Sequence, residues 1–405
     1  MTTSAFLHPF AKPAKAKGDF ITLVRSEGST LWDRDGNAYL DGMASLWCCN
    51  AGHGNRRIID AIKTQLDSMA TYNTFDPWTN EPAERLAAEI AERAPMTDPR
   101  VFFTCSGSEA VDTALKLARL THVRRGDPTR NLLVSRTGGY HGTTYGGTSV
   151  QGIAANKDGW GELLPAVLNV AQNDIEAASR LFAERGNEIA AVIAEPVQGA
   201  GGVHPPAPGY LAGLRRLCDQ HGALLIFDEV ICGWGRLGHW FGAQYYGVTP
   251  DLITFAKGVT SGYAPLGGVI LSRAICDSLE SDPDFLLRHG YTYSGHPTSC
   301  AAGVATLEVY EQDGLFARAD AIATLLEDGL RALVEDGTLA GARGVGAVWA
   351  AELTPDRDAY VVRDAMLAQG VIARPLVNSI ALCPPLVMTD DEVGRLIDSL
   401  ATALR

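Results

Sequence analysis

The part of the sequence that decides the fold covers residues 189–196 (IAAVIAEP), 210–221 (YLAGLRRLCDQH) and 222–230 (GALLIFDEV). The first and last are apolar runs of strand length, and the middle one has the spacing of an amphipathic helix. Strands that are apolar on both faces and alternate with helices are typical of a parallel sheet covered on both sides. These residues therefore predict part of an α/β fold.

The same alternation extends along the chain in both directions. Further strand-like runs are RVFFT (100–104), NLLVSR (131–136), LITFA (252–256) and PLGGVILS (265–272). Helical patterns lie between them, among them SEAVDTALKLARLTH at 108–122. We therefore expect a mainly parallel central sheet with helices on both faces.

The two ends of the chain have a different character. After residue 298, long helical patterns alternate with short apolar runs, and residues 30–41 contain two strand-like pieces around the turn signal Asp35-Gly36-Asn37. We expect these parts to pack together. The predicted domains are a large one at 51–298 and a small α+β domain made of 1–50 and 299–405.

The composition excludes several classes of partner. The chain has 405 residues and a formal net charge of −13, which opposes binding to nucleic acids and to anionic membrane surfaces. The first twenty residues lack the apolar core of a signal peptide, and no run of about 18 apolar residues occurs. The eight cysteines form no CxxC pair, so we expect free thiols, no metal site and a soluble cytoplasmic protein.

Polar residues stand at the ends of several apolar runs. In a parallel sheet, ligands bind at the carboxyl ends of the strands, so these residues are candidates for a binding site. Ser106-Gly107-Ser108 precedes a helix expected to begin near Ser108, and forms either a phosphate-binding turn or an ordinary N-cap. Asp228 either holds a cationic ring nitrogen or caps a turn, and a metal role lacks partner residues. Lys257 either extends to solvent or is a desolvated amine able to form a Schiff base. Together the three sites match the attachment points of pyridoxal phosphate (PLP).

Ten stretches in order carry a resemblance to a known family. The chain resembles the class III, fold-type I PLP aminotransferases over essentially its whole length, and within them the omega-transaminases or amine:pyruvate aminotransferases. The matching stretches are HPF, LWDRDGNAYLDGMASLWCCNAGHG, YNTF, SGSEAVDTALKLAR, GGYHGTTYGG, AEPVQGAGGV, LLIFDEVICGWGRLGHWF, PDLITFAKGVTSGY, YTYSGHPTSCAA and LCPPLVMT. The resemblance implies a PLP-dependent transaminase that acts as a homodimer with shared active sites.

The resemblance also implies roles for the cofactor-binding residues. Lys257 would form the Schiff base with PLP and later move a proton, and Asp228 would pair with the pyridine nitrogen. The phosphate would be bound by Gly107 and Ser108, with Thr292 reaching in from the other subunit. The remaining residues implied around the cofactor ring are Tyr140 on one face, Val230 on the other, and His141 and Glu195 beside it.

A second set of residues is implied for substrates, which would be an amine donor and a keto acid, with pyruvate expected. Arg374 matches a mobile arginine that pairs with the keto-acid carboxylate and swings away for an apolar amine; read without the resemblance, it is a surface residue before Pro375. The matches for the pocket walls are Phe10, Trp47, Tyr140 and Ala200, with Phe75 contributed by the partner.

The chain also departs from the family pattern near the substrate pocket. Asp76-Pro77-Trp78 follows YNTF, and RPLVNSIAL (374–382) replaces a segment that usually contains glycine. A carboxylate at the pocket mouth favours a donor with a distal cation. The alternative substrates are therefore a diamine, 4-aminobutyrate or a diamino acid, and a further alternative activity is that of an aminomutase.

Overall fold

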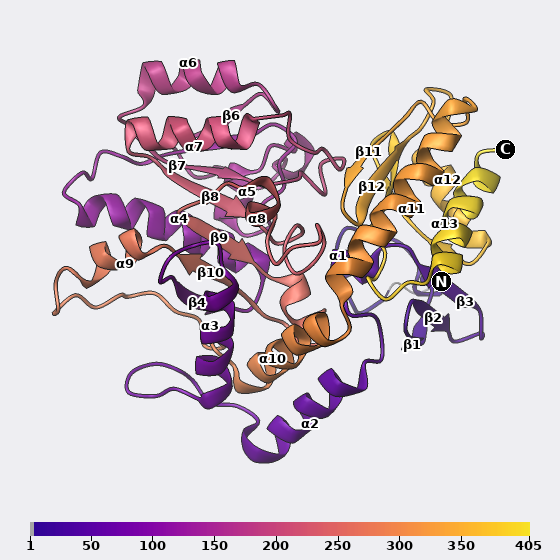
Figure 1. The fold of residues 1–405 in the computed structure, drawn as a ribbon, viewed down its shortest axis with the longest axis horizontal. Helices are drawn as coiled ribbons and strands as arrows, with labels where there is room; N and C mark the ends of the chain where they lie inside the picture. The colour runs from indigo at the N-terminus through magenta and orange to yellow at the C-terminus, as the bar shows by residue number, and fades with distance from the viewer. Residues whose placement is uncertain (1–3) are drawn as a thin grey trace.

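The computed structural model describes residues 4–405 and is built around one large sheet (Figure 1). This seven-stranded sheet has the order β4-β10-β9-β8-β7-β5-β6. Its neighbours from β6 through β5, β7 and β8 to β9 run parallel, whereas β10 is antiparallel to both β4 and β9. The strands are β4 Arg100–Thr104, β5 Leu132–Arg136, β6 Val167–Val170, β7 Ile189–Ala194, β8 Leu224–Asp228, β9 Leu252–Phe255 and β10 Gly267–Leu271.

Helices cover both faces of this sheet. Both faces of the central strand β8 are therefore buried, which explains why its residues before Asp228 are all apolar. Leu225 and Phe227 pack in one apolar cluster with residues of α7, while Leu224 and Ile226 pack in a second cluster with residues of α4. The mainly parallel, doubly covered sheet is therefore confirmed. The helices of this part are α4 Gly107–Arg124, α5 Tyr145–Val150, α6 Ile175–Arg185, α7 Tyr210–His221, α8 Gly242–Tyr246 and α9 Arg273–Glu280.

Two smaller four-stranded sheets lie together on the right of Figure 1, near both chain ends. One has the order β1-β2-β3-β13, and its strands β3 and β13 pair in parallel across the length of the chain. The predicted hairpin is present between β2 and β3, with Gly36 at a φ of 87°. The strands are β1 Leu23–Glu27, β2 Thr30–Asp33, β3 Ala38–Asp41, β11 Gly341–Val345, β12 Val348–Glu352, β13 Val371–Ile372, β14 Arg374–Leu376 and β15 Ser379–Leu382.

Of the remaining helices, α3 packs against β4 of the large sheet, whereas α11 and α12 pack against strands of the smaller sheets. α10 packs against α2 and α3, and α11 packs against α13 (Figure 1). Their bounds are α1 Ala44–Trp47, α2 Arg56–Met69, α3 Glu81–Arg93, α10 Pro297–Gln312, α11 Leu315–Glu335, α12 Ala359–Ala368 and α13 Asp390–Ala403. The predicted domain boundaries after residues 50 and 298 stay a prediction.

Two findings concern the composition of the described chain. Across residues 4–405, no helix has the length and apolar character needed to span a membrane. The structure places all eight cysteines as free thiols, six of them buried.

Candidate active site

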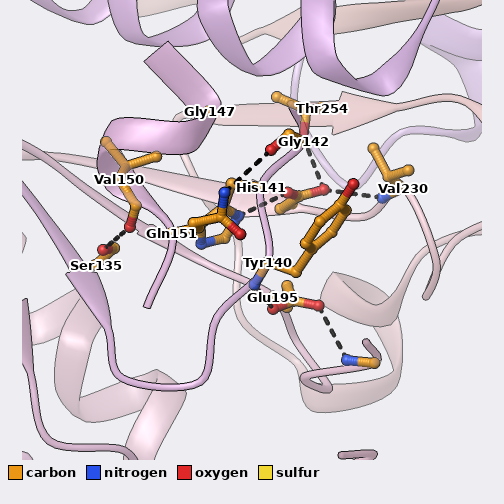
Figure 2. Close-up of polar contacts among 12 residues, drawn as sticks. Ser135, Tyr140, His141, Gly142, Gly147, Val150, Gln151, Glu195, Val230 and Thr254 are labelled. Atoms are coloured by element: carbon orange, nitrogen blue, oxygen red, sulfur yellow. Dashed lines mark hydrogen bonds and ion pairs between the residues drawn. The ribbon is translucent and has the colours of Figure 1, made fainter. Parts of the chain in front are cut away.

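Asp228 lies at the carboxyl end of β8 and is held by three hydrogen-bond donors (Figure 2). His141 donates through Nδ1 to Oδ2 at 2.8 Å, while the hydroxyl of Thr254 and the N–H of Val230 donate to Oδ1 at 3.1 and 3.2 Å. The carboxylate is buried. Because a buried carboxylate needs such donors, the arrangement satisfies the oxygens of Asp228 and holds the group in one orientation.

Lys257 begins the short 3-10 turn that follows β9, the strand next to β8. Its φ of 50° is uncommon for a residue other than glycine, and the next residue must be glycine because a Cβ at Gly258 would lie 2.7 Å from Trp234 Cβ. Burial lowers the pKa of Lys257, and the negative charge of Asp228 opposes that shift. A lysine in such surroundings is a stronger nucleophile at neutral pH than an exposed one.

Glu195, at the end of β7, is a second buried carboxylate near Asp228. It accepts the N–H of Tyr140 at 3.0 Å and the N–H of Gly199 at 2.9 Å (Figure 2). Burial raises the pKa of Glu195, and the charge of Asp228 adds to that effect while His141 opposes it. These bonds fix the loop that carries Tyr140 beside the Asp228–His141 pair.

The turn before α4 forms the anion-binding end of the site. The helix begins at Gly107, one residue before the predicted start, because Ser106 is the N-cap and its Oγ accepts the N–H of Glu109 at 3.2 Å. The hydroxyl of Ser108 is therefore not the cap, and it accepts the N–H of Thr143 at 3.1 Å. The N–H groups of the first helical turn have no acceptor within the helix, so they can bind a phosphate. A Cβ at Gly107 would lie 3.0 Å from the Val230 side chain, which closes the other side of this turn.

Of the residues predicted to bind the substrate, one is fully buried among apolar side chains and two are half-buried. Trp47 is buried in an apolar cluster with Ile231 and Leu376, and Ala200 is half-buried in the loop after β7. Arg374 begins β14 and is half-buried. Burial lowers the pKa of Arg374, and the hydroxyls of Tyr140 and Tyr360 oppose that shift.

Three predicted residues are exposed to solvent in the single chain. Phe10 is 78% exposed, Phe75 is 52% exposed, and Thr292 is exposed. The segments of Phe75 and Thr292 lie side by side, because the Thr74 hydroxyl donates to the Ser294 carbonyl at 2.8 Å. Both residues therefore belong to one exposed surface.

Sequence reasoning missed two residues of the site and left the partner of a third undefined. Thr254 lies within the apolar run of β9, and the signal for it was a polar residue in a buried strand beside the strand of Asp228. Gly199 gave no signal, because it acts through its backbone N–H. The partner of His141 is Asp228, 87 positions further along the chain.

The residues present fit pyridoxal phosphate. Asp228 is a buried anion suited to a protonated ring nitrogen, Lys257 is a desolvated amine suited to Schiff-base formation, and the turn at Gly107 offers N–H groups to a phosphate. The fold and these three features together define a fold-type I PLP-dependent transferase.

Comparisons with known proteins agree with this class. The model of the family described as aminotransferase class-III matches residues 12–404. An omega-aminotransferase of Caulobacter vibrioides is 40% identical, covering 99% of this chain and 97% of that protein. A putrescine–pyruvate aminotransferase of Pseudomonas aeruginosa is 36% identical over 96% of this chain and 92% of its own length. The chain belongs to the class III aminotransferases, and its cofactor is PLP.

Solved structures give the same result. An amine transaminase from an uncultivated Pseudomonas species, in its PLP-bound form, is 37% identical with a TM-score of 0.94, covering 100% of this chain and 99% of that one. An (S)-enantioselective omega-transaminase from Thermomicrobium roseum is 36% identical with a TM-score of 0.95, covering 98% of this chain and 95% of that one. The expected enzyme class, fold and cofactor are thereby confirmed.

Proposed function

We propose that this aminotransferase moves the amino group of a primary amine or ω-amino compound to a keto acid, pyruvate, in two successive half-reactions. The observation that carries the proposal is the state of Arg374. Within residues 4–405, the guanidinium has no carboxylate within ion-pair distance, and Leu376, two positions further along β14, packs in the apolar cluster that contains Trp47. A free cation next to an apolar wall suits a site that accepts a carboxylate in one half-reaction and an apolar amine in the other.

PLP supplies the electron sink that stabilises negative charge at the substrate carbon. Lys257 Nζ would attach the cofactor and, once a substrate amine has displaced it, would take the proton from the substrate carbon and pass it to the cofactor instead of back to the same carbon. The lowered pKa of Lys257 favours this role, because only the neutral amine accepts a proton. Asp228 holds the ring nitrogen in its protonated form, and His141 orients Asp228.

The other proposed cofactor contacts are those implied by the resemblance to the family. Gly107 and Ser108 bind the phosphate, and Tyr140 and Val230 hold the two faces of the ring. Glu195 stays beside the ring and fixes the Tyr140 loop through the N–H of Tyr140. Thr292 completes the phosphate site of the second subunit in a homodimer.

The substrate contacts divide by polarity. Trp47 and Ala200 form the apolar wall within one subunit, together with the ring of Tyr140, and Arg374 binds the keto-acid carboxylate. Phe10 and Phe75, both exposed in one chain, contribute to this wall once a second subunit is bound. Phe75 shares its exposed surface with Thr292, so one contact between subunits would complete both the phosphate site and the Phe75 side of the substrate pocket.

A second candidate donor is a diamine. Asp76 is exposed next to Phe75, so the surface that completes the pocket carries a carboxylate. A distal ammonium group is attracted to such a carboxylate, whereas a purely aromatic amine gains nothing from it. The putrescine–pyruvate aminotransferase relative supports this candidate as well.

A panel of donors tests the proposal. Aromatic amines, aliphatic amines, putrescine, 4-aminobutyrate and a diamino acid are each assayed with pyruvate and with 2-oxoglutarate, and the loss of PLP absorbance is followed. Turnover of amines with pyruvate is the expected result, and turnover with 2-oxoglutarate alone contradicts the acceptor assignment. A reaction that runs to completion without any keto acid identifies an aminomutase instead.

A further inference from the structure

The turn that carries Trp47 is strained. Ala44, Ser45 and Trp47 have φ values of 47°, 60° and 65°, although none of them is glycine. Such conformations are uncommon for side chains with a Cβ, and they persist only where surrounding contacts hold them. Contacts from neighbouring residues must therefore hold this turn, and with it Trp47, in place.

Asp41, at the end of β3, makes these contacts as hydrogen bonds. Its Oδ1 accepts the N–H of Met43 at 3.0 Å, and its Oδ2 accepts the N–H of Ser45 at 2.7 Å. His53 Nε2 lies 2.8 Å from the same Oδ2, and because a carboxylate only accepts, the imidazole is the donor. The carboxylate is fully buried, so these three bonds satisfy it and tie both sides of the strained turn to one group.

His53 is itself fixed on its other side. Its Nδ1 lies 3.5 Å from Cys49 Sγ, and burial raises the pKa of Cys49 so that the thiol keeps its proton and can donate it. The backbone of His53 exchanges two hydrogen bonds with Gly28, at 2.9 and 2.8 Å. His53 therefore links the strained turn, through its imidazole, to Gly28, which directly follows strand β1.

Gly42 anchors the turn to the C-terminal strands. Its N–H donates to the Ile372 carbonyl at 3.0 Å, and its carbonyl accepts the N–H of Cys383 at 2.7 Å. A Cβ at this position would lie 2.5 Å from the Ile372 oxygen, so only glycine fits. Asp41 thus acts on a turn whose ends cannot move.

We propose that Asp41 and His53 are positioning residues that hold Trp47 as the wall of the amine pocket and so set the size of the donor amine. This rests on the role proposed above for Trp47. The charge of Asp41 orients the N–H groups of Met43 and Ser45, and His53 keeps that charge in place. Neither side chain needs to touch the substrate.

The chain offers a matched control in Asp33, at the end of β2. This carboxylate also accepts two backbone N–H groups, those of Asp35 at 3.0 Å and Asn37 at 2.8 Å, and two side-chain donors, the hydroxyl of Tyr39 at 2.8 Å and the amide of Asn37 at 2.9 Å. It stabilises the hairpin between β2 and β3, which contains no residue assigned to the site. Replacing Asp33 therefore tests the cost of losing a similar carboxylate elsewhere in the same sheet.

The experiment compares Asp41→Asn, His53→Ala, Asp33→Asn and Trp47→Ala as holoenzymes. The readout is the ratio of kcat/KM for an arylalkyl amine to kcat/KM for isopropylamine, both with pyruvate, alongside PLP absorbance and the thermal midpoint. Loss of a fixed wall admits larger donors, so Trp47→Ala and Asp41→Asn should each raise the ratio about tenfold. His53→Ala should raise it less, and Asp33→Asn should leave it unchanged.

Two results overturn the inference and are distinguishable from each other. A raised ratio for Trp47→Ala with an unchanged ratio for both Asp41→Asn and His53→Ala leaves Trp47 as a wall but removes the positioning role. An unchanged ratio for Trp47→Ala itself refutes the pocket role of Trp47 and the inference with it. If Asp41→Asn does not fold, His53→Ala decides between these outcomes, because His53 reaches the turn only through Asp41 and Cys49.

Discussion

The hydroxyl of Thr254 gives a direct test of how much the fixed charge of Asp228 contributes to turnover. Thr254→Val keeps the shape of the side chain and removes the donor that lies 3.1 Å from Asp228 Oδ1. Two donors remain, His141 at 2.8 Å and the N–H of Val230 at 3.2 Å. The carboxylate therefore stays in place but loses part of its stabilisation as an anion.

The size of the effect follows from the charge on Asp228. A hydrogen bond to a charged group contributes about 1.5 to 3 kcal/mol, and the two remaining donors place this one at the lower end. If that stabilisation supports the transition state, a loss of about 1.4 kcal/mol lowers kcat roughly tenfold. The KM for pyruvate should change little, because the residue proposed to bind the keto-acid carboxylate is Arg374 and not Asp228.

The assay is steady-state turnover of the preferred amine with pyruvate across a range of pH. Thr254→Ser is the matched control, since it keeps the hydroxyl and loses only a methyl group. The valine variant should have a lower kcat than the serine variant, because only the serine variant keeps a hydroxyl donor to Asp228. Equal kcat values and superimposable profiles for the valine and serine variants would refute the role assigned to this hydroxyl.

Three further predictions concern other groups. Lys257→Ala should abolish turnover and the absorbance of the lysine-linked imine, and survival of either contradicts the assignment. Arg374→Lys should raise the KM for pyruvate about tenfold and leave the KM for the amine near its original value, because an ammonium cannot reproduce bidentate pairing; equal effects on both substrates would contradict it. Burial raises the pKa of Glu229 to about 8, whereas the ordinary value in the unfolded chain is 4.5. Between about pH 5 and 8 the native state therefore holds a proton that the unfolded chain has released, so the free energy of unfolding falls as the pH rises through that range. Glu229→Gln should therefore flatten the fall of the thermal midpoint over that range, although the N–H groups of Gly242 and Ala243 lose one acceptor oxygen; an unchanged slope in calorimetry at pH 5 and 8 would contradict the assignment.

Local sequence was sufficient for the large sheet and for the reactive ends of its strands. The apolar runs before Asp228 and Lys257 form strands whose two faces are both buried. A strand buried on both faces needs apolar residues at nearly every position, so the run is visible in the local sequence. The turn before α4 was also predictable, although its cap is Ser106 and the helix starts one residue earlier than expected. Capping depends on which hydroxyl reaches a backbone N–H, and the two serines of the turn cannot be distinguished by spacing alone.

The sequence by itself determined the strands, the chemistry at their ends and the family resemblance, because each of these depends on residues close together in the chain. Only the tertiary structure decided which groups donate hydrogen bonds to Asp228, since Thr254 and His141 come from separate segments of the chain. It also decided that Asp41 and His53 meet beneath the turn of Trp47. A hydrogen bond depends on a distance of about 3 Å and on direction, and both are set by how distant segments pack.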